Sequence, residues 1–259
     1  RFESIREHTS MGVRGKVKKM VKSPNGAEII PVDAKILSLP TLRPAFSVYG
    51  GNLPSLEKRL DIRAADLRRE KAQAIFSIMR AVLRAVREFL QDNGYLEVVT
   101  PKLITSATEG GASLFSVLYY NKPAFLTQSP QLYKEQLVMP FEKVFEIGPA
   151  FRAEESRTQR HLSEITSVDI EEAYVDYGDI MSTLEGLLRH VVKKIESECS
   201  EQFARLKVNP PKPLAEFPSF TYDNVVSRLE KQGQTISWGE DITGRAMAKL
   251  AKELGSFYL

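Results

Sequence analysis

The stretch FRAEESRTQRHLSE, from Phe151 to Glu164, decides the fold. It joins two strand-like segments, KVFEIGPAFRAE at 143–154 and EITSVDIEEAYV at 164–175, through a loop rich in charged residues. Two β-prone runs separated by such a loop predict an antiparallel hairpin. We therefore take this hairpin as the centre of the predicted fold.

The predicted hairpin collects side chains of both charges on one face. Because side chains alternate between the two faces of a strand, Arg152 and Glu154 point the same way, and so do Asp169 and Glu171. The loop adds Arg157, Arg160 and His161. Arginine binds phosphate through paired hydrogen bonds, and a glutamate can accept a hydrogen bond from an amino group. This face suits a polyphosphate with an amine at its other end; a solvated hairpin of salt bridges is the structural alternative.

Long helices accompany this hairpin along the chain. Apolar residues that recur at helical spacing and the capping signals predict helices at about 65–91, 179–206, 222–232 and 242–254. The segments YLEVVTPKL at 95–103 and AFLTQS at 124–129 are strand-like. Strands packed with long helices, without βαβ alternation, predict an α+β fold built on an antiparallel sheet.

The N-terminal part has a different character. MGVRGKVKKMV at 11–21 and AEIIPVDAKILS at 27–38 predict a second hairpin, with Pro24-Asn25-Gly26 as its turn. Two strands cannot close a core alone, so residues 1–40 are interpreted as the end of a small β-domain. A basic edge strand whose lysines prevent aggregation is the alternative. Prolines and glycines predict a linker over 41–58.

Composition excludes several classes of protein. The chain has 259 residues, enough for one large domain or a domain with a small appendage, and its 42% hydrophobic residues are typical of a globular protein. Cys199 is the single cysteine, which excludes an internal disulfide and a cysteine-built zinc site. No apolar run is long enough to span a membrane or to form a signal peptide, so a cytoplasmic protein is expected. The net charge of +3 is too small to indicate nucleic-acid binding.

Five ordered segments together resemble the class II aminoacyl-tRNA synthetases. The segment at 151–164 resembles motif 2, and FLQDNGYLEVVTPKL at 89–103 resembles motif 1, which ends at a proline. RLDIR at 59–63 is similar to the signature that leads into the catalytic domain of the subgroup with an N-terminal OB-fold. SATEGGASLF at 106–115 and TQSPQLYKE at 127–135 resemble substrate loops of aspartyl-tRNA synthetases of archaeal and eukaryotic type.

This resemblance implies an organisation and an activity. Residues 1–40 would be the last strands of an OB-fold anticodon-binding domain, and 59–259 the N-terminal part of a class II catalytic domain with motifs 1 and 2. No segment matches motif 3, so this stretch alone is expected to be inactive. The implied reaction is ATP-dependent activation of L-aspartate to aspartyl-adenylate, followed by transfer to the 3′ end of tRNA. Whether tRNA for asparagine is charged as well stays open.

The resemblance also implies site residues, one by one. The ATP site would contain Arg152, Glu154, Arg160, His161 and Leu162, and the aspartate site Glu109, Ser129, Gln131, Lys134, Arg152 and Asp169. Arg152 would be the catalytic residue. Lys134 would pair with the side-chain carboxylate of aspartate and reject asparagine, because a neutral amide would leave a buried lysine unpaired. Read alone, Lys134 is better explained as a surface lysine at a helix start, and only its place in the motif reverses this interpretation. No metal ligand is implied here, and Mg²⁺ is expected to bind beyond residue 259.

Partners and competing functions complete these expectations. Motif 1 implies a homodimer, and the reaction implies L-aspartate, ATP and tRNA as partners, with no membrane. One alternative is an asparaginyl-tRNA synthetase or a related paralogue, against which Lys134 argues. The other is a non-catalytic, synthetase-derived binding module; the absence of motif 3 favours it, whereas the intact Arg152, Glu154 and His161 argue against it.

Overall fold

The computed structural model describes two compact units of the chain. The described residues are 5–23, 26–42, 44–49, 51–105, 114–153, 162–212 and 217–254. The first unit covers 1–77 and the second 78–259, so that the boundary falls within the long helix α3 (Glu70–Asp92).

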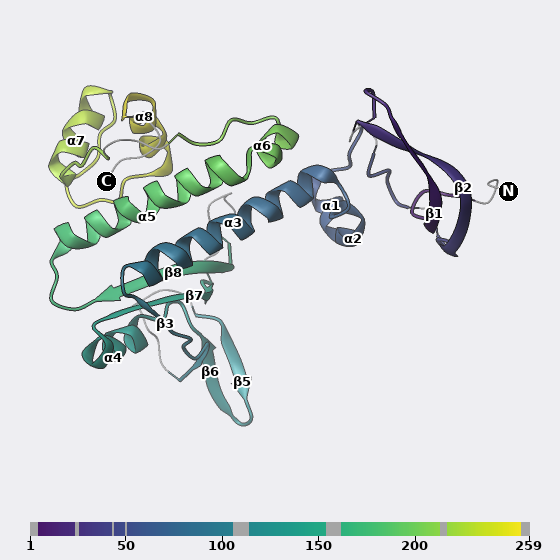
Figure 1. The fold of residues 1–259 in the computed structure, drawn as a ribbon. Coiled ribbons are helices and arrows are strands. Elements are labelled where there is room, and N and C mark those ends of the chain that lie inside the picture. Colours follow the sequence, from purple (N-terminus) through teal and green to yellow (C-terminus); the bar gives the residue numbers. More distant parts are fainter. Residues whose placement is uncertain are drawn as a thin grey trace. The chain divides into compact units, whose positions relative to one another are not determined.

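The first unit begins with the predicted N-terminal hairpin. Strands β1 (Ser10–Lys19) and β2 (Ala27–Ser38) pair antiparallel, with irregularities in the register near Met11 and Gly15 (Figure 1). Gly26 has φ of +67°, in the left-handed region that a glycine adopts without strain. The other two residues of the predicted turn lie outside the described residues. The hairpin is therefore confirmed as a strand pair.

The helix predicted over 65–91 is wrong at its start. The chain forms α1 (Leu56–Asp61) and α2 (Arg63–Asp66) before α3 begins at Glu70. The cause is the buried carboxylate of Asp66, which accepts hydrogen bonds from Arg59 (3.2 Å), Arg63 (2.7 Å) and Arg69 (2.7 Å). The hydrogen bond from Arg69 and the other arginine contacts lower the pKa of Asp66, although burial opposes them. The turn between α2 and α3 lets three guanidinium groups converge on one carboxylate.

The central sheet of the second unit contains the predicted hairpin. Strands β3 (Leu96–Glu97), β7 (Lys143–Phe151) and β8 (Glu164–Glu172) lie in the order β3-β7-β8. β7 and β8 are antiparallel throughout, and the short β3 pairs with β7 in parallel. The hairpin and the α+β class with antiparallel sheets are confirmed, with β3–β7 as a parallel exception.

The strands between residues 103 and 126 form a second sheet. Strands β4 (Leu103–Ile104), β6 (Lys122–Leu126) and β5 (Ser116–Tyr119) pair antiparallel in that order, and α4 (Gln131–Phe141) begins five residues after β6. The single strand predicted at 95–103 is wrong, because the structure divides it into β3 and β4. The backbone amide of Thr100 donates to a side-chain carboxylate instead of a neighbouring strand, and Pro101 has no amide hydrogen to donate.

Four helices complete the second unit: α5 (Tyr177–Glu198), α6 (Ser200–Leu206), α7 (Tyr222–Lys231) and α8 (Gly244–Leu254). The predicted helices are confirmed, except that Cys199 interrupts the one expected at 179–206. In the part of the chain that the structure describes, no helix is long and apolar enough to cross a membrane.

The central sheet has one apolar and one polar face. Leu90 of α3, Phe145 of β7 and Leu187 of α5 belong to one buried cluster, so α5 and the second half of α3 cover the same face (Figure 1). Because neighbouring residues of a strand point to opposite faces, Glu146 and Asp169, which are paired in the register, lie on the other face. This polar face is where the predicted site residues gather.

A buried polar network connects the strand ends far from the β7–β8 loop. The carboxylate of Glu172 accepts hydrogen bonds from the hydroxyl of Tyr95 and from Nζ of Lys143, the latter at 2.5 Å. Burial would raise the pKa of Glu172, but the hydrogen bonds from Lys143 and Tyr95 outweigh it, so the pKa of Glu172 is lowered. Together these contacts join the residue before β3 to the ends of β7 and β8.

Replacing Glu172 by glutamine should reduce the free energy of unfolding by about 1–3 kcal/mol at pH 7, because Lys143 loses its charged partner. A lowered folded-state pKa stabilises the fold above the unfolded value of about 4.3, and this contribution is lost as the pH falls below that value. Denaturant titrations should therefore show a stability difference that shrinks on acidification. The exposed pair of Glu198 and Arg84 provides the control, since E198Q should cost no more than about 0.5 kcal/mol. An undiminished difference at pH 3 would contradict this account.

Candidate functional site

The loop between β6 and α4 carries buried polar side chains. Thr127 and Ser129 are both buried, and the hydroxyl of Thr127 donates to the carbonyl of Ser129 at 2.7 Å. The amide of Thr127 donates to the carbonyl of Lys102, and the amide of Phe151 donates to the carbonyl of Thr127. Ser129 in turn accepts from the backbone amide of Gln131 at 3.3 Å. The loop is thus fixed between the chain before β4 and the end of β7.

Lys134 lies in the first turn of α4 and is only 2% exposed. Its Nζ donates to the carbonyl oxygen of Ile170 at 3.0 Å and to Oε2 of Glu171 at 3.4 Å, and it lies 3.8 Å from Oδ1 of Asp169. All three partners belong to β8. The interpretation of Lys134 as a surface lysine is therefore wrong, because its ammonium group is turned into the polar face of the sheet.

Two further side chains extend this arrangement. Nε2 of Gln131 donates to Oε1 of Glu135 at 2.9 Å and to Oε2 of Glu171 at 3.3 Å. We call Gln131, Lys134, Glu135, Asp169 and Glu171 the Lys134 cluster. Within it, one ammonium group faces two carboxylates directly, so Lys134 with its two acidic neighbours carries one net negative charge. The sequence predicts Asp169 and Glu171 on one face, and the resemblance puts Asp169 in the same site as Lys134, but neither indicates the contact between Glu171 and Lys134.

This pairing changes the expected basis of substrate choice. We expected asparagine to be rejected because its amide would leave Lys134 without an anion. That argument fails for the described residues, because Glu171, Asp169 and the carbonyl of Ile170 already satisfy the ammonium group.

The end of the hairpin carries the other predicted site residues. The amide of Arg152 donates to the carbonyl of Ser163 at 3.0 Å, which continues the pairing of β7 and β8 toward the loop. Leu162 is 66% exposed, and Arg152 directly follows Phe151, whose amide binds the 127–131 loop. The predicted residues Glu109, Glu154, Arg160 and His161 lie outside the described residues.

The structure therefore brings one part of the predicted site together. Ser129 contacts Gln131 and Lys134 contacts Asp169, and Glu171 joins the two pairs by accepting from both Gln131 and Lys134. Arg152 lies one residue beyond the strand end that binds their loop. Such a group offers hydroxyl, amide, ammonium and carboxylate functions at one place. These are the functions that a small zwitterion with a polar side chain would require.

Sequence reasoning missed Glu146, which lies in the middle of β7 and is 2% exposed. Its carboxylate accepts hydrogen bonds from the amide (2.8 Å) and hydroxyl (2.7 Å) of Thr100, and lies 2.8 Å from Nζ of Lys102. Lys102 also presents its carbonyl to Thr127, so Glu146 supports the site loop indirectly. An acidic residue within the apolar run VFEIG was the available signal, since a buried carboxylate requires partners.

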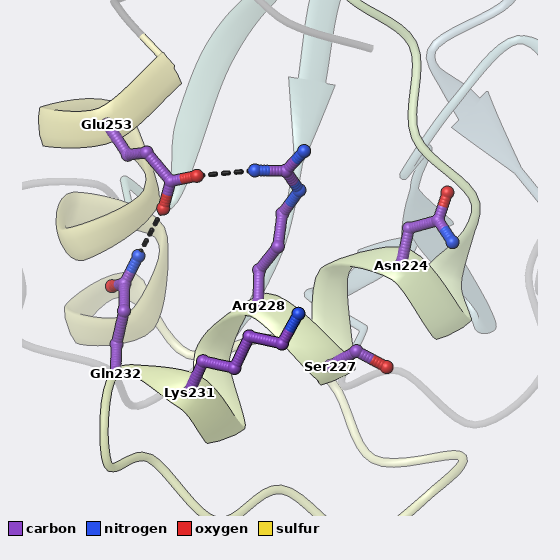
Figure 2. Close-up of a pocket in the computed structure, with 6 residues that line it drawn as sticks. All are labelled: Asn224, Ser227, Arg228, Lys231, Gln232 and Glu253. Atoms are coloured by element: carbon purple, nitrogen blue, oxygen red, sulfur yellow. Dashed lines mark hydrogen bonds and ion pairs between the residues drawn. The ribbon is translucent and has the colours of Figure 1, made fainter.

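A separate hollow of about 530 Å³ lies between α7 and α8. Figure 2 shows that Arg228 of α7 and Gln232, which directly follows α7, both point at the carboxylate of Glu253 of α8. The other lining residues drawn there are Asn224, Ser227 and Lys231. Arg228 and Gln232 already donate hydrogen bonds to Glu253. Their polar groups therefore do not converge on a position for a ligand.

A divalent metal finds no prepared ligand set in the described ranges. Among those residues, no group of three or more histidine, cysteine, aspartate or glutamate side chains is placed to hold a metal ion. Asp169 and Glu171, the acids of the site, are both directed at Lys134.

The support given by Glu146 can be measured. Replacing Glu146 by glutamine should lower the free energy of unfolding by about 1–3 kcal/mol, because Lys102 loses the anion beside it. Glu97 of the neighbouring strand β3, which forms a more exposed pair with Arg87 of α3, is the matched control. E97Q should cost less than about 1 kcal/mol in the same denaturant titration. Equal losses in the two variants would contradict the special role of Glu146.

Comparison with known proteins places these observations in context. The model of a family described as tRNA synthetases class II (D, K and N) matches residues 55–251. The aspartate–tRNA(Asp/Asn) ligase of Archaeoglobus fulgidus is 42% identical over 257 residues, which is 99% of this chain and 60% of that protein. The corresponding ligase of Methanopyrus kandleri is 44% identical over 256 residues, 97% of this chain and 59% of that protein.

Solved structures agree with this similarity. Asparaginyl-tRNA synthetase from Pyrococcus horikoshii, complexed with asparaginyl-adenylate, superposes with a TM-score of 0.86 at 32% identity. That superposition covers 98% of this chain and 58% of the other. The chain thus spans about three fifths of the length of the curated relatives it matches.

Proposed function

The chain belongs to the class II tRNA synthetases of the D, K and N group, and from this membership we propose that it is part of an aspartate–tRNA ligase. The whole protein would activate L-aspartate with ATP and transfer it to the 3′ end of tRNA. The curated relatives named aspartate–tRNA(Asp/Asn) ligases, about 40% identical over nearly the whole chain, support this choice. The observation that carries it is this identity over nearly the whole chain, and the buried Lys134 in the first turn of α4 offers an ammonium group for the substrate side chain.

The proposed chemistry has two steps. The α-carboxylate of aspartate attacks the α-phosphate of ATP, forming aspartyl-adenylate and releasing pyrophosphate. A hydroxyl of the terminal adenosine of tRNA then attacks the carbonyl carbon, and AMP leaves. Reactions of this kind are accelerated mainly by positioning and by stabilising negative charge. Arg152, at the end of β7, would bind the α-phosphate and the substrate carboxylate, where that charge develops.

The remaining roles divide between two groups of residues. Lys134 would bind the side-chain carboxylate of aspartate, while Ser129, Gln131 and Asp169 would complete the polar lining. Glu109 would hold the substrate ammonium, Glu154 the adenine amino group, and Arg160 and His161 the distal phosphates; Leu162 would contribute to the ATP site. The roles of Glu109, Glu154, Arg160 and His161 rest on the family motif alone. Of the residues proposed for the ATP site, the structure describes Arg152 and Leu162.

Partners and organisation remain part of the proposal. Members of this family act on an amino acid, ATP and tRNA, and we extend this to the present protein, with Mg²⁺ accompanying ATP. We also propose a homodimer formed through the motif 1 segment at 89–103 and a cytoplasmic location. The division into an OB-fold remnant at 1–40, a linker at 41–58 and a catalytic part from 59 onward is proposed on the same basis.

A second candidate is activation of asparagine. Two observations favour it: the superposition on an asparaginyl-tRNA synthetase and the pairing of Lys134 by the protein's own acceptors. A neutral amide entering this cluster would leave no buried charge unpaired. The higher identity to aspartate–tRNA ligases makes aspartate our first choice.

Amino-acid-dependent exchange of pyrophosphate into ATP decides between the two. We expect the full-length protein to support exchange with aspartate and to do so poorly with asparagine. Exchange with asparagine alone would overturn the first choice in favour of the second. Failure with both amino acids, in a protein shown to be folded, would support a non-catalytic module instead.

The proposed role of Arg152 predicts a large effect on the first step. Removing one group that stabilises developing negative charge typically costs a factor of about 10²–10³ in rate, and R152A should lose at least that much exchange activity. Arg205, which pairs with Glu201 one turn earlier in α6, is the control, and R205Q should retain activity close to wild type. A mild effect of R152A would contradict the assignment.

A further inference from the structure

Among the described residues, Glu171 is the acidic residue nearest to the ammonium group that would recognise the substrate side chain. We propose that Glu171 is a specificity-determining residue whose negative charge limits the preference of the site for aspartate over asparagine. This inference rests on the proposed function, because it concerns the same site. It adds a residue that neither the motif nor the comparisons assign to substrate choice.

The ammonium group of Lys134 is held by a neutral acceptor. Its Nζ donates to a backbone carbonyl, that of Ile170, at 3.0 Å, and this neutral acceptor is fixed by the sheet. The two carboxylates are farther away, with Glu171 at 3.4 Å and Asp169 at 3.8 Å. Lys134 therefore has a neutral acceptor that a change of charge at position 171 leaves in place.

The charges of Lys134, Asp169 and Glu171 add up to a negative charge. Lys134 is 2% exposed, and the side chains of Asp169 and Glu171 are 24% and 27% exposed, so water screens these charges only in part. Among the described residues, these two carboxylates against one ammonium leave one net negative charge. Aspartate would bring a third carboxylate into this group, whereas asparagine would bring a neutral amide. The existing charge therefore disfavours aspartate relative to asparagine.

Glu171 differs from Asp169 and Glu135 in its contacts. Its Oε2 lies within hydrogen-bonding distance of both Lys134 and Gln131, two residues proposed to bind the substrate. Asp169 instead accepts a hydrogen bond from the hydroxyl of Ser167. Glu135 accepts from Gln131 at 2.9 Å but has no contact with Lys134 among the described residues. Glu171 thus combines proximity to the ammonium with a place beside the incoming side chain.

Glutamine is a suitable replacement because only the charge changes. Its amide oxygen can still accept from Lys134 and Gln131, so the hydrogen-bond geometry can be retained. Lys134 keeps Asp169 and the carbonyl of Ile170 as partners in E171Q, and the group of Lys134 with its neighbours becomes neutral. The variant therefore tests the charge of Glu171 and not the loss of a partner for Lys134.

The experiment compares pyrophosphate exchange with aspartate and with asparagine in the full-length wild-type protein, E171Q and E135Q. The measured quantity is the ratio of kcat/KM for aspartate to kcat/KM for asparagine. We expect this ratio to rise about tenfold in E171Q. The substitution removes a negative charge beside the side-chain carboxylate of bound aspartate, in a site that water screens only in part. E135Q removes a carboxylate that also binds Gln131, and its ratio should stay within about twofold of wild type.

A ratio is insensitive to general damage, because a loss of active protein lowers both activities equally. An unchanged or lower ratio in E171Q would overturn the proposal, and so would an equal rise in E135Q. E171M is a second neutral variant, and its ratio must also rise if E171Q does not fold. Activity of the wild-type protein with aspartate tests the proposed function separately, so the two failures are distinguishable.

Discussion

A buried ammonium group must have acceptors, and the site of this protein is arranged around that requirement. Lys134 is almost fully buried, and its acceptors are the carbonyl of Ile170 and the carboxylates of Glu171 and Asp169. Because the lysine belongs to α4 and all three acceptors belong to β8, the pairing fixes the helix against the polar face of the sheet. The loop that precedes α4 is held in the same place.

A buried charge of the opposite sign supports the neighbouring strand. Glu146 lies opposite Asp169 in the register of β7 and β8, and its partners are Thr100 and Lys102. Lys102 then binds the backbone of Thr127, at the start of the loop that leads to Lys134. One buried anion and one buried cation on the same face thus determine where both segments run. Each stabilises the fold only because its partners are in place, since an unpaired buried charge is costly.

Local patterns in the sequence predicted the elements, and long-range pairing decided their limits. Hydrophobic periodicity correctly predicted α5, α7 and α8, and alternation predicted the β7–β8 hairpin. The start of α3 was missed because Asp66 draws together arginines from both sides of a turn. The division of β3 from β4 was missed because Thr100 bonds to Glu146, which is 46 residues away. For the site, the family motif indicated Lys134, but no pattern in the sequence indicated that Glu171 is already paired with its ammonium group.

The central claim is that Lys134 is the group that receives the substrate side chain while remaining held by the carbonyl of Ile170. A crystal structure of the full-length protein with aspartyl-sulfamoyl adenosine tests it most directly. The account predicts that the side-chain carboxylate of the ligand lies within hydrogen-bonding distance of Nζ of Lys134, with the contact to Ile170 retained. A ligand carboxylate bound elsewhere, with Lys134 still paired only to Ile170, Glu171 and Asp169, would contradict it.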